Sequence, residues 1–194
     1  MTKNDLFKKS VSGGKWVTFS IVFQKVIGFL SFLVLARILS PEHYGSMAVA
    51  TIAVGFLDVI FQPSFEMALS QKRETDKNML NVVWTLNVLR GFLLGIIVYF
   101  VAPYIADFFK VPEDLNLIRA TALFVVIRGF INIGQLFFFY DFDFRKVFIL
   151  ESSGQVFYII VTLLVALTFE PSQWALYFGQ LAVSICTVTA SFAL

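Results

Sequence analysis

The stretch Gly14–Gly45, GKWVTFSIVFQKVIGFLSFLVLARILSPEHYG, decides how the rest of the chain is organised. It contains a long apolar run with one lysine, Lys25, near its middle, and it ends in a short turn segment, Arg37–Gly45. An apolar helix of about 20 residues is long enough to cross a bilayer. A lysine halfway along such a helix costs several kcal/mol unless it faces a partner or a water-filled cavity. The stretch therefore predicts a transmembrane helix and an interior that holds something charged.

The composition places the whole chain in the membrane class. Of its 194 residues, 58% are hydrophobic and 14% are charged, whereas soluble domains have about 45–50% apolar and about 25% charged residues. The basic residues are scattered between apolar segments, so no basic patch indicates nucleic-acid binding. The N-terminal segment is basic, as in a signal peptide, but the apolar run after it is about 20 residues long and has no convincing cleavage site. We therefore expect an integral membrane protein whose first helix is uncleaved.

Six long apolar segments predict an all-α bundle of six transmembrane helices. Each segment is too long for a strand, and the barrel-like alternation that a membrane β-barrel requires is absent from the pattern. Proline-containing turns and charged loops separate the segments. We expect them to form a single lobe with helices at about 15–36, 44–69, 81–106, 115–140, 148–169 and 174–194.

The distribution of lysine and arginine predicts the orientation of this lobe. Nine of the 15 basic residues fall in the N-terminal segment and in the loops after the second and fourth expected helices. The opposite side carries Arg37 and Lys110, accompanied by the carboxylates of Glu42, Asp107, Glu113, Asp114 and Glu170. Because positively charged loops stay in the cytoplasm, we expect a cytoplasmic N-terminus and a cytoplasmic side after the sixth helix.

Charged and polar residues also fall inside the expected helices. With a rise of about 1.5 Å per residue, Lys25, Asp58, Arg90 and Arg128 all lie near the middle of the bilayer. Helical spacing aligns further polar residues with them, because side chains three, four or seven positions apart share a helix face. The expected polar lining of an interior cavity consists of Gln24, Asp58, Gln62, Asn87, Asn132 and Gln135.

The central charges do not balance, and this favours an anionic ligand. Lys25, Arg90 and Arg128 are three cations, and Asp58 is one anion. The surplus indicates a ligand such as a phosphate group, which cationic side chains bind through charge-assisted hydrogen bonds. A buried pair that only fixes helix packing, Asp58 with Lys25 or with Arg90, is an equally open interpretation of any single pair.

Signatures of catalysis are missing from the sequence. His43 is the single histidine and follows Glu42 in a turn, and Cys186 is the single cysteine and lies in an apolar stretch, so an intrachain disulfide is impossible. The sequence contains no metal-ligand spacing, no nucleotide-binding loop and no hydrolase or acyltransferase signature. We expect no catalytic residue, no metal, no cofactor and no enzyme activity.

The turn after the first helix also carries a resemblance. Ala36–Gly45, ARILSPEHYG, resembles the "ARxLxPxxYG" segment of the Wzx-type oligosaccharide flippases in the multidrug/oligosaccharidyl-lipid/polysaccharide (MOP) exporter superfamily. Two further stretches are similar to the same family. They are Gly55–Asp58, which precedes a basic loop, and Phe142–Lys146, which leads into Glu151. The resemblance covers nearly the whole chain.

The resemblance implies a fold and a function. Such exporters have two lobes that alternate between inward-open and outward-open states, and they move an undecaprenyl-pyrophosphate-linked oligosaccharide to the outer leaflet of the bacterial inner membrane. This chain would be the N-terminal lobe of an incomplete protein. By the same resemblance, Lys25, Arg90 and Arg128 would contact the pyrophosphate. The implied partners are the lipid-linked oligosaccharide, membrane lipid and the polysaccharide polymerase machinery.

Two alternatives stay open. The first is a cation-coupled exporter of drugs or small molecules from the same superfamily, with Asp58 as the ion site. The second is a membrane scaffold that does not transport, or an inert fragment.

Overall fold

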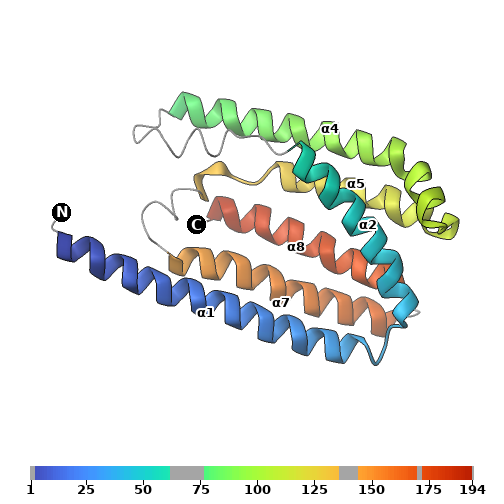
Figure 1. The fold of residues 1–194 in the computed structure, drawn as a ribbon, viewed down its shortest axis with the longest axis horizontal. Coiled ribbons are helices and arrows are strands. Elements are labelled where there is room, and N and C mark those ends of the chain that lie inside the picture. The colour runs from blue at the N-terminus through green and yellow to red at the C-terminus, as the bar shows by residue number, and fades with distance from the viewer. Residues whose placement is uncertain (1–2, 62–76, 136–143, 170–171, 194) are drawn as a thin grey trace.

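The fold is entirely helical throughout the residues that the structure describes. A computed structural model describes residues 3–61, 77–135, 144–169 and 172–193. The predicted all-α class is confirmed, since these ranges contain six α-helices, two short 3₁₀ helices and no strand. In chain order the elements in Figure 1 are α1 (Lys3–Leu35), α2 (Pro41–Ile60), α4 (Lys77–Phe109), η1 (Pro112–Asp114), α5 (Leu115–Gly129), η2 (Ile133–Gln135), α7 (Phe144–Thr168) and α8 (Gln173–Ala193).

The bundle has the dimensions and the surface of a multi-pass membrane protein. Five helices, α1, α2, α4, α7 and α8, are long and apolar enough to cross a membrane. Large apolar side chains cover the outside, among them Phe100, which is 70% exposed, and Phe108, which is 81% exposed. In water such a surface would drive aggregation, whereas in lipid it faces acyl chains. Figure 1 shows that α1 begins and α8 ends at the same end of the bundle.

The turn between α1 and α2 is built by residues of the stretch Gly14–Gly45. Leu35 and Leu39 are buried and hold the turn against the core. Ser40 precedes α2, Pro41 occupies its first turn, and the Ser40 backbone N–H donates to Nδ1 of His43 at 3.3 Å. Proline suits the first helical turn because its missing N–H would have no partner there. His43 therefore acts as a structural residue of the helix start.

The connection from α4 to α5 is equally well specified. Lys110 has a φ of 57°, in the left-handed region, directly after the last residue of α4. The N–H of Val111 donates back to the carbonyl of Ala106 at 2.9 Å, a bond that closes helix C-termini of this type. Asp114, which is 2% exposed, begins α5 and accepts a hydrogen bond from Gln173 of α8 at 3.4 Å. This connector therefore ties α4, α5 and α8 together.

Helix α5 lies at the centre of the bundle. It contacts α4, α8 and α2, and Leu117, Ile118 and Phe124 on it are at most 2% exposed. The main core cluster joins these helices and the end of α1. Its buried members are Leu35, Leu39, Met47, Val54, Leu94, Val98, Leu117, Phe124, Val125, Leu176 and Tyr177.

Glycines allow α4 and α5 to approach each other closely. A Cβ on Gly91 would lie 2.9 Å from the Cα of Gly129, and one on Gly95 would lie 2.5 Å from a methyl group of Val126. Small residues at helix contacts are typical of membrane bundles, where close van der Waals packing drives association. The backbone atoms of α5 are thereby held against one face of α4.

The other side of the bundle consists of α1, α7 and α8. Helix α7 packs between the other two, with Gly179 of α8 seated against Thr162 and Tyr158 of α7. An aromatic cluster fastens α1 to α7, because the rings of Phe19 and Phe23 lie 5.5 and 5.3 Å from that of Phe148. Aromatic pairs at this separation add to the free energy gained by burial.

The fourth helix differs from the prediction of a helix over residues 115–140. Helix α5 ends at Gly129 and is followed by an irregular turn and by η2. Its 15 residues span about 22 Å, which is less than the hydrocarbon core of about 30 Å. The reason is local. The N–H groups of Phe130 and Ile131 donate to carbonyls three residues earlier instead of four. The Phe130 carbonyl accepts a hydrogen bond from Trp84, and the Asn132 N–H donates to Ser191. Arg128, Asn132 and Gln135 would share one face of that longer helix, and because α5 ends at Gly129 this common face does not form.

The remaining expected helices agree with the structure apart from their ends. Helix α1 begins upstream of residue 15, and α4 extends beyond 81–106 on both sides. The helix expected at 44–69 is described as α2 up to Ile60. Phe61 is the C-cap of α2, and residues 62–69 of that expected helix, including Gln62, lie outside the described residues.

Candidate functional site

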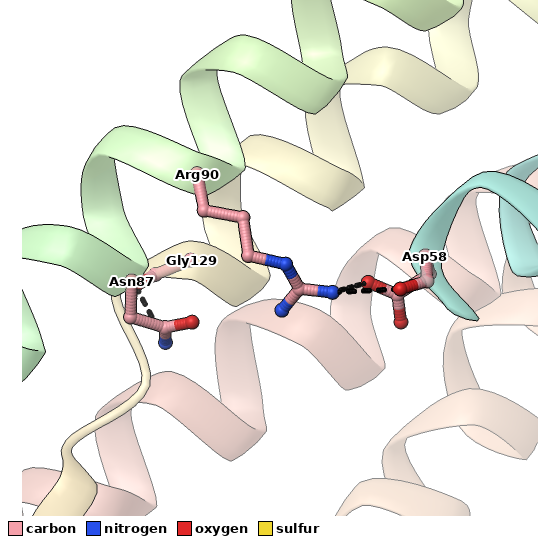
Figure 2. A network of polar contacts seen from close by, with 4 residues as sticks. All are labelled: Asp58, Asn87, Arg90 and Gly129. Atoms are coloured by element: carbon pink, nitrogen blue, oxygen red, sulfur yellow. Dashed lines mark hydrogen bonds and ion pairs between the residues drawn. The ribbon is translucent and has the colours of Figure 1, made fainter. Parts of the chain in front are cut away.

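An ion pair joins α2 to α4 inside the membrane span. Asp58 lies in the last turn of α2, and Arg90 lies in the middle of α4. The Arg90 guanidinium forms a salt bridge with the Asp58 carboxylate, and its Nη2 also donates to the Asp58 main-chain carbonyl at 3.0 Å. Figure 2 shows the arginine extended from α4 toward the end of α2. The side chain of Arg90 is 21% exposed and that of Asp58 is 46% exposed, so the pair lies at an open edge of the bundle.

Two further side chains of α4 bind the end of α5. Nδ2 of Asn87 donates to the carbonyl of Gly129 at 3.2 Å, as Figure 2 shows. The indole N–H of Trp84 donates to the carbonyl of Phe130 at 3.3 Å. The last carbonyls of a helix have no partner within the helix, and in a membrane they need one from elsewhere. Asn87 and Trp84 satisfy this requirement for α5.

Trp84, Asn87 and Arg90 recur every three residues along α4 and have a common role. The first two satisfy carbonyls at the end of α5, and Arg90 binds a carbonyl in the last turn of α2. A cation near a helix C-terminus is also favoured by the partial negative charge of the carbonyls there. This polar face of α4 therefore holds the C-terminal ends of two neighbouring helices.

The irregular turn after α5 has its own polar contacts. The Asn132 backbone N–H donates to Oγ of Ser191 on α8 at 3.0 Å. The Asn132 side-chain oxygen accepts from the N–H of Gly134 at 2.8 Å. Non-helical backbone at membrane depth is tolerated where protein or a wet cavity surrounds it. Asn132 thus has a structural role in ending α5, in addition to its expected place in a cavity lining.

Lys25 lies apart from this cluster. It is exposed on α1, which packs along α7 and lies at the opposite edge of the bundle from α4 in Figure 1. Its neighbour Gln24 is half-buried and donates to Oγ of Ser20 at 2.9 Å, one turn earlier. The structure therefore does not bring Lys25 into contact with Arg90 or Arg128.

Arg128 is exposed in the last turn of α5, beside the Gly129 carbonyl that Asn87 binds. Within the described ranges, Asp58–Arg90 is the ion pair that forms, and neither Arg128 nor Lys25 has a carboxylate partner. The three cations of the sequence hypothesis thus fall into two kinds. Arg90 is neutralised inside the fold, whereas Lys25 and Arg128 project from it.

The other predicted positions add little to the geometry. Gln62 lies outside the described residues, and for Gln135 only the backbone, in η2, is described. In the described part of the chain, no three His, Cys, Asp or Glu side chains come close enough to hold a metal ion.

Sequence reasoning missed Trp84 and Gly129 as members of the polar cluster at the end of α5. A signal for Trp84 was present, because it precedes Asn87 and Arg90 by three and six residues on one helix face. No comparable signal marked the carbonyl of Gly129 as an acceptor. That role depends on where α5 ends.

Comparison with known proteins gives a family model and several curated relatives. The family model, described as "Polysaccharide biosynthesis protein", matches residues 34–194. The chain is 23% identical over 95% of its length to an "Uncharacterized membrane protein in cps region" of Klebsiella pneumoniae. It is 27% identical over 77% of its length to the "Lipopolysaccharide biosynthesis protein WzxC" of Escherichia coli. It is also 27% identical over 70% of its length to the "Succinoglycan biosynthesis transport protein ExoT" of Rhizobium meliloti.

The relatives are much longer than this chain. The aligned region covers 38% of the Klebsiella protein, 30% of WzxC and 28% of ExoT. No solved structure matches the chain.

Proposed function

Because the chain belongs to the polysaccharide biosynthesis protein family, we propose that it is one membrane lobe of an exporter of polysaccharide precursors. The substrate is an undecaprenyl-pyrophosphate-linked oligosaccharide, which alternating access moves from the inner to the outer leaflet. Two relatives support this substrate class, since one is named for lipopolysaccharide biosynthesis and another for succinoglycan transport. The lobe assignment is supported by the fraction of each relative that the chain covers.

The observation that carries the proposal is the pair of exposed cations inside apolar helices. Lys25 lies within the apolar span Thr18–Leu35, and Arg128 lies in α5. A cation facing lipid at this depth costs several kcal/mol, so such residues face a wet cavity or an anion. Neither has a carboxylate partner among the described residues. A pyrophosphate group supplies the missing negative charge and accepts the charge-assisted hydrogen bonds that arginine and lysine donate.

Arg90 takes a different part in the proposal. Its guanidinium already holds Asp58, yet its buried Nε finds no hydrogen-bond partner in the part of the chain that the structure describes. The Asp58 side chain is nearly half exposed, so an anion arriving beside the pair competes with the carboxylate for Arg90. Lys25 and Arg128 are the resident phosphate contacts, and Arg90 joins them when it exchanges Asp58 for the ligand. The polar lining is then Gln24, Asp58, Gln62, Asn87, Asn132 and Gln135.

The proposal also includes location and orientation. The protein lies in the bacterial inner membrane with its N-terminus in the cytoplasm, as the excess of lysine and arginine on that side favours. The polysaccharide polymerase machinery is the partner that receives the exported precursor. The chain acts as a transporter and not as an enzyme.

The alternative of a cation-coupled exporter of small molecules has less support. It requires a carboxylate that is free to bind and release an ion, and Asp58 is bonded to Arg90. The surplus of Lys25 and Arg128 also opposes a cationic substrate.

The test is surface polysaccharide in cells that carry single substitutions in the chromosomal gene. We expect Lys25→Ala and Arg128→Ala each to reduce surface polysaccharide by at least about ten-fold at unchanged protein level, because a hydrogen bond to a charged group contributes about 1.5–3 kcal/mol. Arg37→Ala removes an exposed cation in the turn before α2 and serves as the matched control. Undiminished export in both variants would overturn the phosphate assignment.

A further inference from the structure

A groove runs along the bundle surface between α4 and α5, on residues that the proposed transport site does not use. Its volume is about 490 Å³, within the range of about 300–1,000 Å³ that is usual for ligand sites. Apolar side chains form the walls, and the aromatic ring of Tyr99 and the guanidinium of Arg119 lie together in it. The apolar lining includes Phe92, Ile96, Leu123 and Val126.

Among the residues that the structure describes, Arg119 has no anionic partner. Its guanidinium carbon lies 5.2 Å from the centre of the Tyr99 ring, which holds the side chain by a cation–π contact. Its Nε is buried and has no hydrogen-bond partner within the described ranges. Asp107 lies in the last turn of α4, and Glu113 lies just before α5. Neither carboxylate forms an ion pair with Arg119 in the described part of the chain.

The walls of the groove face the surroundings of the bundle. Ile96 is 58% exposed and Leu123 is 50% exposed, although both are large and apolar. Gly95 deepens the groove because it places no side chain between these walls. In a membrane, an acyl chain fills such a slot, and the unpaired cation at its side needs the negative charge that a lipid phosphate carries.

We propose that this groove binds one membrane glycerophospholipid, with the phosphate on Arg119 and an acyl chain along Ile96, Leu123 and Val126. The inference is independent of the transport proposal, because none of these residues belongs to the phosphate contacts suggested there. Charge complementarity decides the occupant: a packed apolar helix would cover the groove equally well but would leave Arg119 unneutralised. Because Arg119 carries a full positive charge, an anionic headgroup binds better than a zwitterionic one.

The test is native mass spectrometry of the purified full-length protein in detergent with added phosphatidylglycerol or phosphatidylethanolamine. We expect the wild type to retain phosphatidylglycerol, and Arg119→Gln to retain it at least about five-fold less, since one charged hydrogen bond is lost. Ile96→Trp fills the slot from an exposed position and should lower retention of both lipids. Because Ile96 is not buried, this variant tests the groove even where Arg119→Gln folds poorly.

Matched variants separate this site from general surface charge and from the transport site. Arg37→Gln removes an exposed cation in the turn that follows α1, and Lys25→Ala removes one of the proposed pyrophosphate contacts; both should retain phosphatidylglycerol as the wild type does. Equal retention in the wild type and Arg119→Gln would overturn the proposal. So would an equal loss in Arg37→Gln, or a wild-type protein that carries no phospholipid, which would assign the groove to a protein segment instead.

Discussion

Arg90 binds α2 twice, through the carboxylate of Asp58 and through its main-chain carbonyl. Both contacts are made by one guanidinium nitrogen, Nη2, which carries two N–H donors and so reaches the carboxylate and the carbonyl together. The pair therefore fixes the end of α2 against the middle of α4, whatever else Arg90 does during transport.

Removing both members of this pair should destabilise the fold by less than the sum of the two single removals. We expect Arg90→Met and Asp58→Asn each to cost about 1–3 kcal/mol, because each leaves a charged or polar partner unmatched. The double variant should cost less than the sum of the two by about 1 kcal/mol. The measurement is unfolding of the purified protein in detergent.

Asp107→Asn is the matched control for this cycle. Asp107 is exposed and forms no ion pair within the described ranges, so its change should stay within about 0.5 kcal/mol. Strict additivity of the two substitutions at the Asp58–Arg90 pair would contradict a coupling between them.

At the scale of elements, the crossing of α4 and α5 determines how the centre of the bundle is built. Gly91 and Gly129 bring the two backbones together, and the same approach places the end of α5 within reach of Asn87. Close packing and the polar contacts thus depend on each other. A side chain on either glycine would separate the helices and lengthen the Asn87–Gly129 hydrogen bond.

Gly91→Ala should therefore destabilise the protein by about 1–3 kcal/mol, the usual cost of overpacking. The Cβ would meet backbone of α5 at 2.9 Å, and backbone cannot rotate away as a side chain does. Gly55→Ala is the matched control, because nothing lies within 4 Å of a Cβ at that helical position. There the gain in helix propensity should stabilise the protein by up to about 1 kcal/mol.

Unfolding of both variants in detergent checks this expectation. An unchanged stability of Gly91→Ala would mean that α4 and α5 are further apart than the structure describes. A destabilised Gly55→Ala would indicate that the exposed face of α2 is packed against something in the complete protein.

The bundle as a whole is apolar on its outside, and the charges within its candidate membrane spans include the Asp58–Arg90 pair and Lys25. Figure 1 shows the turns that follow α1 and α4 at the end opposite to the start of α1. The bias of lysine and arginine predicts that these turns lie at the outer face of the membrane. Exposed Glu42 and Glu113 mark this end in the structure.

Cysteine labelling tests this orientation. In a Cys186→Ala background, which removes the one native cysteine, Glu42→Cys and Glu113→Cys should react with a membrane-impermeant maleimide on intact spheroplasts. Thr75→Cys, in the basic loop with Lys72 and Arg73, should react only after the membrane is permeabilised. Labelling in the reverse order would invert the orientation and place the N-terminus outside.

The membrane class, the helical fold and most helix positions followed from the sequence by itself. Length and hydropathy determine these features locally, since each apolar segment must satisfy its own backbone hydrogen bonds in lipid. The turn Ser40-Pro41 and the family resemblance around Ala36–Gly45 were also readable from the residues. The end of α5 at Gly129 was not, because the flanking segment is apolar enough to continue a helix.

Only the tertiary structure decided which charges meet. Spacing and depth made Lys25 and Arg90 equal candidates to pair with Asp58. In the fold Asp58 pairs with Arg90, because α2 contacts α4 while α1 packs on α7. The same packing turned Asn87 into a hydrogen-bond donor for the end of α5 and left Lys25 and Arg128 exposed. The physical reason is that periodicity specifies the face of a helix on which a charge lies, but the partner of that face depends on contacts between segments distant in the sequence.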